Sequence, residues 1–256
     1  MATYKKKGRK PSGKEEKQRA AEQESTTAGV FNSLDEGASK TETWVAENQN
    51  FIFIIVGLAI VVVLGYLGWE RFVQEPKETE AANEMAQAQD YFAAALRASG
   101  TESDSLYNLS LTGGEGKYGF VDIVDNYSGT DAANLAKYDA GFAYLYTGKY
   151  QEAIDYLEDF DSDDQILSAL AKGGIGDAFM QLDQPEEALG YYEKAAKIRS
   201  NAFTTPKFLL KAAITALQLK KADDAEGYLT KIKEEYPDSP EAEEVAVYLG
   251  QAQAMK

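Results

Sequence analysis

Three short stretches contain residue types that could do chemistry. Residues 112–119 read TGGEGKYG, residues 173–179 read GGIGDAF, and Asp159, Asp161 and Asp163 alternate along one acidic turn. Glycine-rich turns cradle phosphates or dinucleotides, whereas carboxylates at alternate positions bind calcium. Each stretch therefore has to be compared with the spacing that its chemistry requires.

The two glycine-rich stretches do not match a nucleotide site. A phosphate loop would need glycine where Leu111 stands and Ser or Thr where Tyr118 stands. GGIGDAF lacks the third glycine of a dinucleotide turn and falls inside a predicted repeat helix. We therefore expect these glycines to serve packing, and we predict no cofactor.

The acidic turn also departs from its pattern. Asp164 stands where a calcium loop needs glycine, and Leu170 stands where it needs glutamate. Weak attraction of cations and helix capping by Ser162 or Asp163 stay open, with capping favoured. The chain has no His and no Cys, which removes thiol nucleophiles, histidine metal ligands and the commonest general base. We expect no metal site and no enzymatic activity.

Charge is divided unevenly along a chain whose formal net charge is −16. Eight Lys and Arg but only two Glu lie in the first 19 residues, whereas Lys77–Lys256 contains 16 basic and 32 acidic residues. An acidic surface repels phosphate backbones, so we expect no specific nucleic-acid partner for the C-terminal part. Residues 1–28 should form a disordered basic cytoplasmic tail that contacts anionic lipid headgroups, with a ribosome contact as the alternative.

Phe51–Trp69 reads FIFIIVGLAIVVVLGYLGW and contains no charged residue. At a rise of 1.5 Å per residue it spans about 28 Å, close to the hydrocarbon core of a bilayer. We predict a transmembrane helix at residues 51–69, retained as an anchor because no small-residue cleavage site follows it. Tyr66, Trp69 and Trp44 are candidate interface anchors, although Trp44 could instead belong to a preceding helix.

The orientation of this segment follows from the basic residues, which favour the cytoplasmic side. We therefore predict a bacterial inner-membrane protein with a cytoplasmic N-terminus and with residues 70–256 in the periplasm. An amphipathic cytoplasmic segment is predicted at residues 29–50, where Phe31, Leu34, Ala38 and Val45 recur at helical spacing; it either lies on lipid or touches a membrane partner. Gly57, Gly65 and Gly68 share one face of the span and are either contacts for another membrane helix or ordinary glycine usage.

A second pattern recurs three times after the apolar segment. Each copy contains a small residue, then an aromatic or small residue three positions later, then a turn residue and another small residue. This order describes two closely packed antiparallel helices, and it is the tetratricopeptide signature. The alanines that mark the second helix, Ala153, Ala188 and Ala225, stand 35 and 37 residues apart. We predict an all-α fold in which one N-terminal transmembrane helix precedes a tetratricopeptide-repeat solenoid. The full repeats lie near residues 134–167, 169–203 and 206–239.

The solenoid needs caps at both ends, because each helix pair leaves apolar surface for its neighbours to cover. We predict a capping helix at residues 241–254, assisted by Asp238 or Ser239. A degenerate leading repeat should combine a helix at residues 81–98 with a short helix containing Phe120, Ile123 and Val124. Residues 100–117, rich in Gly, Ser and Thr, are predicted to form a loop between them.

The first helices of the pairs should line an apolar and aromatic groove that binds an extended or helical peptide. The alternative is that the helix at residues 81–98 already fills this groove. Leu170 also falls on this lining. The predicted partner-binding residues are Leu135, Tyr138, Phe142, Leu145, Tyr146, Met180, Leu210, Ile214 and Leu217.

From about Ser25 onward the arrangement resembles the single-pass tetratricopeptide proteins that are ancillary subunits of the bacterial Sec translocon. The run YSGTDAANLA, residues 127–136, is similar to the repeat entry of that family. The resemblance implies a non-enzymatic adaptor beside the translocation channel, binding client polypeptides and periplasmic chaperones. A scaffold for envelope or cell-wall assembly with the same topology is the alternative.

Overall fold

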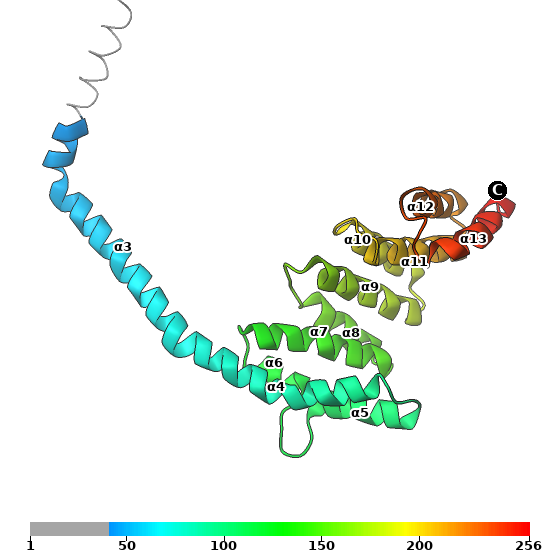
Figure 1. Cartoon of the computed structure of the whole chain (residues 1–256), viewed down its shortest axis with the longest axis horizontal. Helices are drawn as coiled ribbons and strands as arrows, with labels where there is room; N and C mark the ends of the chain where they lie inside the picture. Colours follow the sequence, from blue (N-terminus) through cyan, green and yellow to red (C-terminus); the bar gives the residue numbers. More distant parts are fainter. Residues whose placement is uncertain (1–40) are drawn as a thin grey trace, which may run out of the picture. The chain divides into compact units, whose positions relative to one another are not determined.

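The computed structural model describes residues 41–256, which separate into two compact units, one ending at Trp69 and one beginning at Glu70. All secondary structure in this range is helical (Figure 1), and the predicted all-α class is confirmed. The predicted tail at residues 1–28 and the residues Phe31, Leu34 and Ala38 lie outside the described range.

The first unit contains a helical piece at residues 41–47 and the apolar helix α3 (Gln49–Trp69). A turn at Asn48 separates them, and its Nδ2 donates a hydrogen bond to the Trp44 carbonyl at 2.8 Å. No residue of α3 is buried. Among the described helices, the stretch Gln49–Ala95, which includes α3, is long and apolar enough to cross a membrane, judged by length and composition.

The second unit is an array of helices that begins with a π-helical turn, η1, and the long helix α4. Successive helices pack on one another from α4 to α13 (Figure 1), so the unit is a tetratricopeptide-like solenoid. The bounds are η1 Glu70–Gln74, α4 Glu75–Ala95, α5 Thr101–Thr112, α6 Phe120–Asn126, α7 Asp131–Tyr146, α8 Tyr150–Glu158, α9 Gln165–Gln181, α10 Pro185–Lys197, α11 Thr204–Gln218, α12 Ala222–Glu235 and α13 Ala242–Ala254.

The same turn closes the first helix of each of the three pairs. Gly148, Asp183 and Lys220 all have positive φ, between 57° and 76°. The next residue in each turn donates its N–H to a carbonyl five positions back, as in Lys149 to Tyr144, at 2.8–2.9 Å in all three turns. This is the Schellman arrangement that ends a helix in the left-handed conformation. Residues of three different types thus adopt one backbone geometry, which confirms that the pairs are structural repeats.

Small residues allow the helices of each pair to approach closely. Ala153, Ala188 and Ala225 are completely buried at the equivalent point of each second helix. Gly141 of α7 faces Leu157 of α8, where an added Cβ would lie 2.5 Å from the leucine Cγ. Side chains larger than alanine are therefore excluded at the three alanines, and any side chain is excluded at Gly141, as the spacing predicts.

The glycines of α9 bring the middle repeat against both of its neighbours. A Cβ at Gly173 would lie 1.9 Å from the Phe208 ring of α11, and one at Gly176 would lie 2.6 Å from the Tyr192 ring of α10. Gly174 faces Phe142 of α7 at 3.0 Å. The GGIG stretch is thus a packing site within a helix, as we expect from its sequence.

The predicted loop at residues 100–117 is wrong in its first two thirds, where α5 forms. Its hydroxyl and amide side chains bond carbonyls of their own helix, for example Ser105 to Thr101 at 2.9 Å and Asn108 to Asp104 at 2.8 Å. Tyr107 and Leu111 are buried, one turn apart. Packing of this apolar stripe outweighs the low helix propensity of Ser, Thr and Asn.

Two predicted helix caps are also corrected. Asp164, and neither Ser162 nor Asp163, caps α9 by accepting hydrogen bonds from the N–H groups of Ile166 and Leu167. No side chain caps α13, and the buried Ser239 hydroxyl makes no hydrogen bond within the described residues. In the leading part, α6 contains Phe120, Ile123 and Val124 as predicted, whereas the helix predicted at residues 81–98 is α4, which runs from Glu75 to Ala95 and is separated from α6 by α5.

We predict that Gly173→Ala destabilises the repeat unit by about 1–3 kcal/mol, the usual cost of overpacking a core. The new methyl group would overlap the Phe208 ring, which is buried in the core and has little room to move. Thermal unfolding followed by far-ultraviolet circular dichroism measures the effect.

Gly190→Ala is the matched control. Gly190 lies inside α10 with open space beside it, so the added methyl should raise stability by up to about 1 kcal/mol through helix propensity. Equal effects of the two substitutions would contradict the close approach at Gly173.

Candidate interaction surface

The predicted partner-binding residues lie on the first helices of the pairs, α7, α9 and α11, and we call their common surface the first-helix face. Tyr146 and Ile214 are its most accessible members, with 49% and 36% of their surfaces exposed. Leu210 and Leu217 are buried, at 7% and 9%, within the core around α11. Little of these two leucines is available to a partner. The other members, Leu135, Tyr138, Phe142, Leu145 and Met180, are half-buried.

Aromatic rings form a continuous row along α7. Tyr138 contacts Phe160, which follows α8, with ring centroids 5.1 Å apart, and it contacts Phe142 at 4.8 Å. Phe142 in turn lies 6.1 Å from Tyr146. Such ring contacts add stability beyond the burial of their area, so the row stiffens α7 while leaving Tyr146 accessible.

The leading helices cover one end of this row. Tyr146 contacts Tyr107 of α5 at 5.2 Å and Phe92 of α4 at 6.5 Å. Helix α4 also packs against α5, α6 and α7, but it does not touch α9 or α11. Helix α4 therefore covers the part of the predicted groove that lies along α7, and it leaves the parts along α9 and α11 uncovered.

Sequence reasoning missed a polar cluster in the middle of the first-helix face. Both carboxylate oxygens of Asp177 on α9 accept hydrogen bonds from Lys211 Nζ on α11, at 2.5 and 2.7 Å, and Asp177 Oδ1 also accepts one from the Tyr192 hydroxyl at 2.7 Å. Asp177 occupies the repeat position of Phe142, 35 residues earlier, and of Ile214, 37 residues later. Comparing these equivalent positions could have revealed the polar residue.

The cluster reaches the aromatic row. Burial raises the pKa of Tyr146, and the negative charge of Asp177 raises it further, because that carboxylate lies close to the phenol. Lys211 is itself paired, so the face presents a neutral polar centre between apolar side chains. A peptide lying here would meet hydrophobic contacts on both sides of one charge pair.

A second unanticipated group, Asp139, lies between α4 and α7. The residue is half-buried, and burial raises the pKa of its carboxyl to about 6, while a hydrogen bond with Gln89 of α4 acts in the opposite direction. An ionised carboxylate in this place opposes the packing of the two helices.

The corner between α6 and α7 is held by the last residue of η1 and the start of α4. Glu78 accepts hydrogen bonds from the backbone N–H groups of Asp131 and Ala132, at 2.7 and 2.8 Å. Gln74 and Lys77 donate to the carbonyls of Gly129 and Ser128, each at 2.7 Å. A carboxylate at a helix N-terminus is favourable because it meets unpaired N–H groups and the positive end of the helix dipole. The YSGT run thus forms a corner that α4 holds in place.

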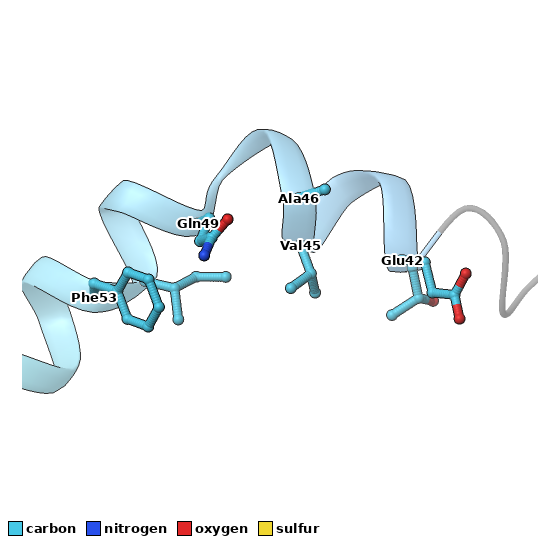
Figure 2. A pocket seen from close by; sticks show the side chains of 7 residues that line it. Glu42, Val45, Ala46, Gln49 and Phe53 are labelled. Atoms are coloured by element: carbon cyan, nitrogen blue, oxygen red, sulfur yellow. The ribbon is translucent and has the colours of Figure 1, made fainter.

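The membrane-facing predictions fall in the first unit. An added Cβ at Gly57, Gly65 or Gly68 would meet no atom within 4 Å, so each position leaves open space beside α3. Where the 41–47 helical piece meets α3, Val45 and Phe53 line a shallow hollow from the two helical pieces (Figure 2). The other lining residues are Thr41, Glu42, Ala46, Gln49 and Ile52. Trp44 and Val45 are exposed. A role of the three glycines in helix contact stays a prediction.

The acidic turn forms no metal-binding cluster of His, Cys, Asp or Glu in the described part of the chain. Residues 113–119 form a turn in which Gly113, Glu115 and Gly116 have positive φ, and Lys117 pairs with Glu84 of α4 at 2.8 Å. A lysine held by a carboxylate is not free to bind a phosphate, in line with the sequence comparison.

The tetratricopeptide-repeat family model matches residues 208–239, which begin within α11 and include α12 and the turn after it. No curated protein matches the chain. Among solved structures, the crystal structure of a putative kinesin light chain of Podosopora anserina, with nearly identical TPR-like repeats, is similar at 15% identity. Its TM-score is 0.48, and the match covers 70% of this chain and 87% of that one. Tetratricopeptide repeats indicate a protein–protein interaction adaptor, and their fold is typically a non-enzymatic scaffold.

We predict that Asp139→Asn removes a pH dependence of stability. The folded protein keeps this proton up to about pH 6, whereas the unfolded chain releases it near 3.8, so stability falls as the pH rises between these values. The variant should lack this fall and should be more stable than the wild type at pH 8. Melting temperatures from about pH 4.5 to about pH 8 measure the difference between the two proteins, and parallel curves would contradict the prediction.

We further predict that Glu78→Ala exposes the first amides of α7. Loss of the two hydrogen bonds should cost about 1–2 kcal/mol and should speed hydrogen exchange at Asp131 and Ala132. Glu102→Ala removes an exposed carboxylate from the first turn of α5 and serves as the control. Unchanged exchange in Glu78→Ala would show that the corner does not depend on this contact.

Proposed function

We propose that the chain is a single-pass membrane protein whose α3 crosses a bacterial inner membrane. The 21 residues of α3 give a length of about 32 Å, enough for a hydrocarbon core. Its large side chains are exposed within the first unit, a costly arrangement in water and a favourable one in lipid. Trp69 at one end and Trp44 before the other suit the two interfaces.

The orientation in this proposal places the N-terminus in the cytoplasm and the repeat unit in the periplasm. Eight of the Lys and Arg residues lie in the first 19 residues, whereas the sequence after Lys77 is strongly acidic. Basic segments near a span are retained on the cytoplasmic side. The basic tail would contact anionic lipid headgroups there.

The repeat unit then acts as an adaptor that binds polypeptides in the periplasm. The observation that supports this function best is the first-helix face, where Tyr146 and Ile214 remain accessible beside the neutral Asp177–Lys211 pair. An apolar face of this kind suits a hydrophobic peptide segment. Clients in transit and periplasmic chaperones are the proposed partners.

The proposed place of action is beside the protein translocation channel. Support comes from the resemblance of the YSGTDAANLA run, and of the arrangement of span and repeats, to ancillary translocon subunits. Gly57, Gly65 and Gly68 would let α3 approach a channel helix closely, because they leave open space. A scaffold for envelope or cell-wall assembly would share the topology but would have envelope-synthesis enzymes as partners.

Site-specific photocrosslinking in intact cells tests these proposals. A photoreactive residue at Gly65 should capture channel subunits, and one at Ile214 should capture secreted polypeptides or chaperones. The same residue at Glu187, which is exposed on α10 away from the first-helix face, is the control. Recovery of envelope-synthesis enzymes would favour the scaffold, and recovery of neither group would overturn the adaptor.

Protease treatment of spheroplasts tests the orientation separately. The repeat unit should be digested while a cytoplasmic marker survives. Survival of the unit beside a digested periplasmic control would place it on the cytoplasmic side.

A further inference from the structure

A pocket of about 640 Å³ opens at one end of α7 and α9, away from the middle of the first-helix face. Four pieces of chain line it: the α6–α7 turn, the start of α7, the loop between α8 and α9, and the start of α9. We call it the corner pocket. Its floor is apolar, formed by Leu135, Phe160 and Leu167, and Phe160 is only 7% exposed because it packs against Tyr138.

Hydrogen bonds hold the walls of the corner pocket in place. Asn134 Nδ2 donates to the Asp161 carbonyl at 2.5 Å, and the Asp161 N–H donates back to Asn134 Oδ1 at 3.3 Å. From the first turn of α9, the Ser168 hydroxyl donates to the carbonyl of Ser162 in the α8–α9 loop at 2.7 Å. The pocket therefore exists before a partner arrives, which lowers the entropy cost of binding.

Most of the first N–H groups of the two helices beside the pocket already have partners within the protein. Those of α7 are taken by Glu78 and by the Thr130 hydroxyl, which accepts from Ala133. In α9 the N–H groups of Ile166 and Leu167 are taken by Asp164. A phosphate or a peptide carboxylate would also meet like charge at the rim.

That rim carries unpaired negative charge. Asp131, Asp161 and Asp163 are exposed pocket residues, and none of them forms an ion pair within residues 41–256. No Lys or Arg lines the pocket. Lys77, Lys137 and Arg199 lie nearby, where they donate to the Ser128 carbonyl, the Asp159 carbonyl and the Gln165 side chain, but none of them pairs with a rim carboxylate. A cation held here would gain attraction from several carboxylates at once.

We propose that the corner pocket binds a client segment in which Lys or Arg adjoins a large apolar side chain. The apolar group enters the pocket over Phe160, Leu135 and Leu167, and the cation pairs with Asp161 and Asp163 at the rim. This inference rests on the proposed adaptor function and names the chemistry of one class of client. In the sequence these aspartates are candidates for calcium or capping, and the pocket assigns Asp161 and Asp163 a different role.

Fluorescence anisotropy with the full-length protein in uncharged detergent tests the proposal. Three ten-residue Gly/Ser peptides carry Leu-Lys-Leu-Arg, Leu-Glu-Leu-Glu or Ser-Lys-Ser-Arg at their centres. Only the first should bind well, and added salt should weaken it, since exposed charges are screened. Equal binding of the second peptide would overturn the role of the rim, and equal binding of the third would overturn the role of the floor.

The matched variants locate the site. Asp161→Asn with Asp163→Asn should weaken the first peptide about fivefold or more, the value expected for the loss of two exposed ion pairs. Glu234→Gln with Glu235→Gln removes the same charge from an exposed end of α12 and should change little. Equal losses in the two double variants would show binding to the general acidic field, which overturns the pocket.

A fourth peptide covering residues 4–19 asks whether the chain's own basic tail is the occupant. Binding equal to that of the Leu-Lys-Leu-Arg peptide would assign the pocket to the tail and overturn the client proposal. Crosslinking through Ile214 tests the first-helix face independently of the corner pocket. A result that overturns the corner pocket can therefore be distinguished from one that overturns the adaptor function.

Discussion

The close approach of helix backbones at α9 is the constraint on which the repeat unit depends. Gly173 and Gly176 admit the rings of Phe208 and Tyr192 where any side chain would collide with them. Through these contacts α9 packs against both α11 and α10, and it does so along one short stretch of its backbone. The positions of Asp177 and Lys211 follow from this packing, because the two helices must lie side by side before the charges can meet. The charge pair on the first-helix face is therefore a consequence of how the core packs.

The repeat positions could be predicted from the sequence because their constraints are local and recur. Gly148, Asp183 and Lys220 mark one turn geometry, and Ala153, Ala188 and Ala225 mark one close contact. The helix α5 was missed because Ser, Thr and Asn favour loops in isolation. What stabilises it is the burial of Tyr107 and Leu111 against helices distant in the sequence, and composition alone carries no sign of that contact.

The surface was predictable in outline and not in detail. Spacing placed Tyr146 and Ile214 correctly on first helices, but it could not distinguish them from Leu210 and Leu217, which the neighbouring helices enclose. The corner pocket depends on the α6–α7 turn meeting the α8–α9 loop, about 30 residues away, so its apolar floor is visible in three dimensions only. Asp161 and Asp163 are conspicuous in the sequence, yet their relation to Phe160 and Leu135 decides what they can bind.

The attachment of α4 to the α6–α7 corner has a practical consequence for cutting the protein into pieces. A soluble fragment is naturally begun where the apolar stretch has ended and the predicted helix starts, near Ala81. Such a fragment would discard Gln74 of η1 with Lys77 and Glu78 of α4, and with them the side chains that hold the backbone of the 128–132 turn. The leading helices would then be free to shift, and Tyr146 would lose part of its cover. The shortened protein would then expose surface that the intact chain covers, and ligands captured on that surface would not be ligands of the intact chain. A fragment for dissection should therefore begin at Glu70.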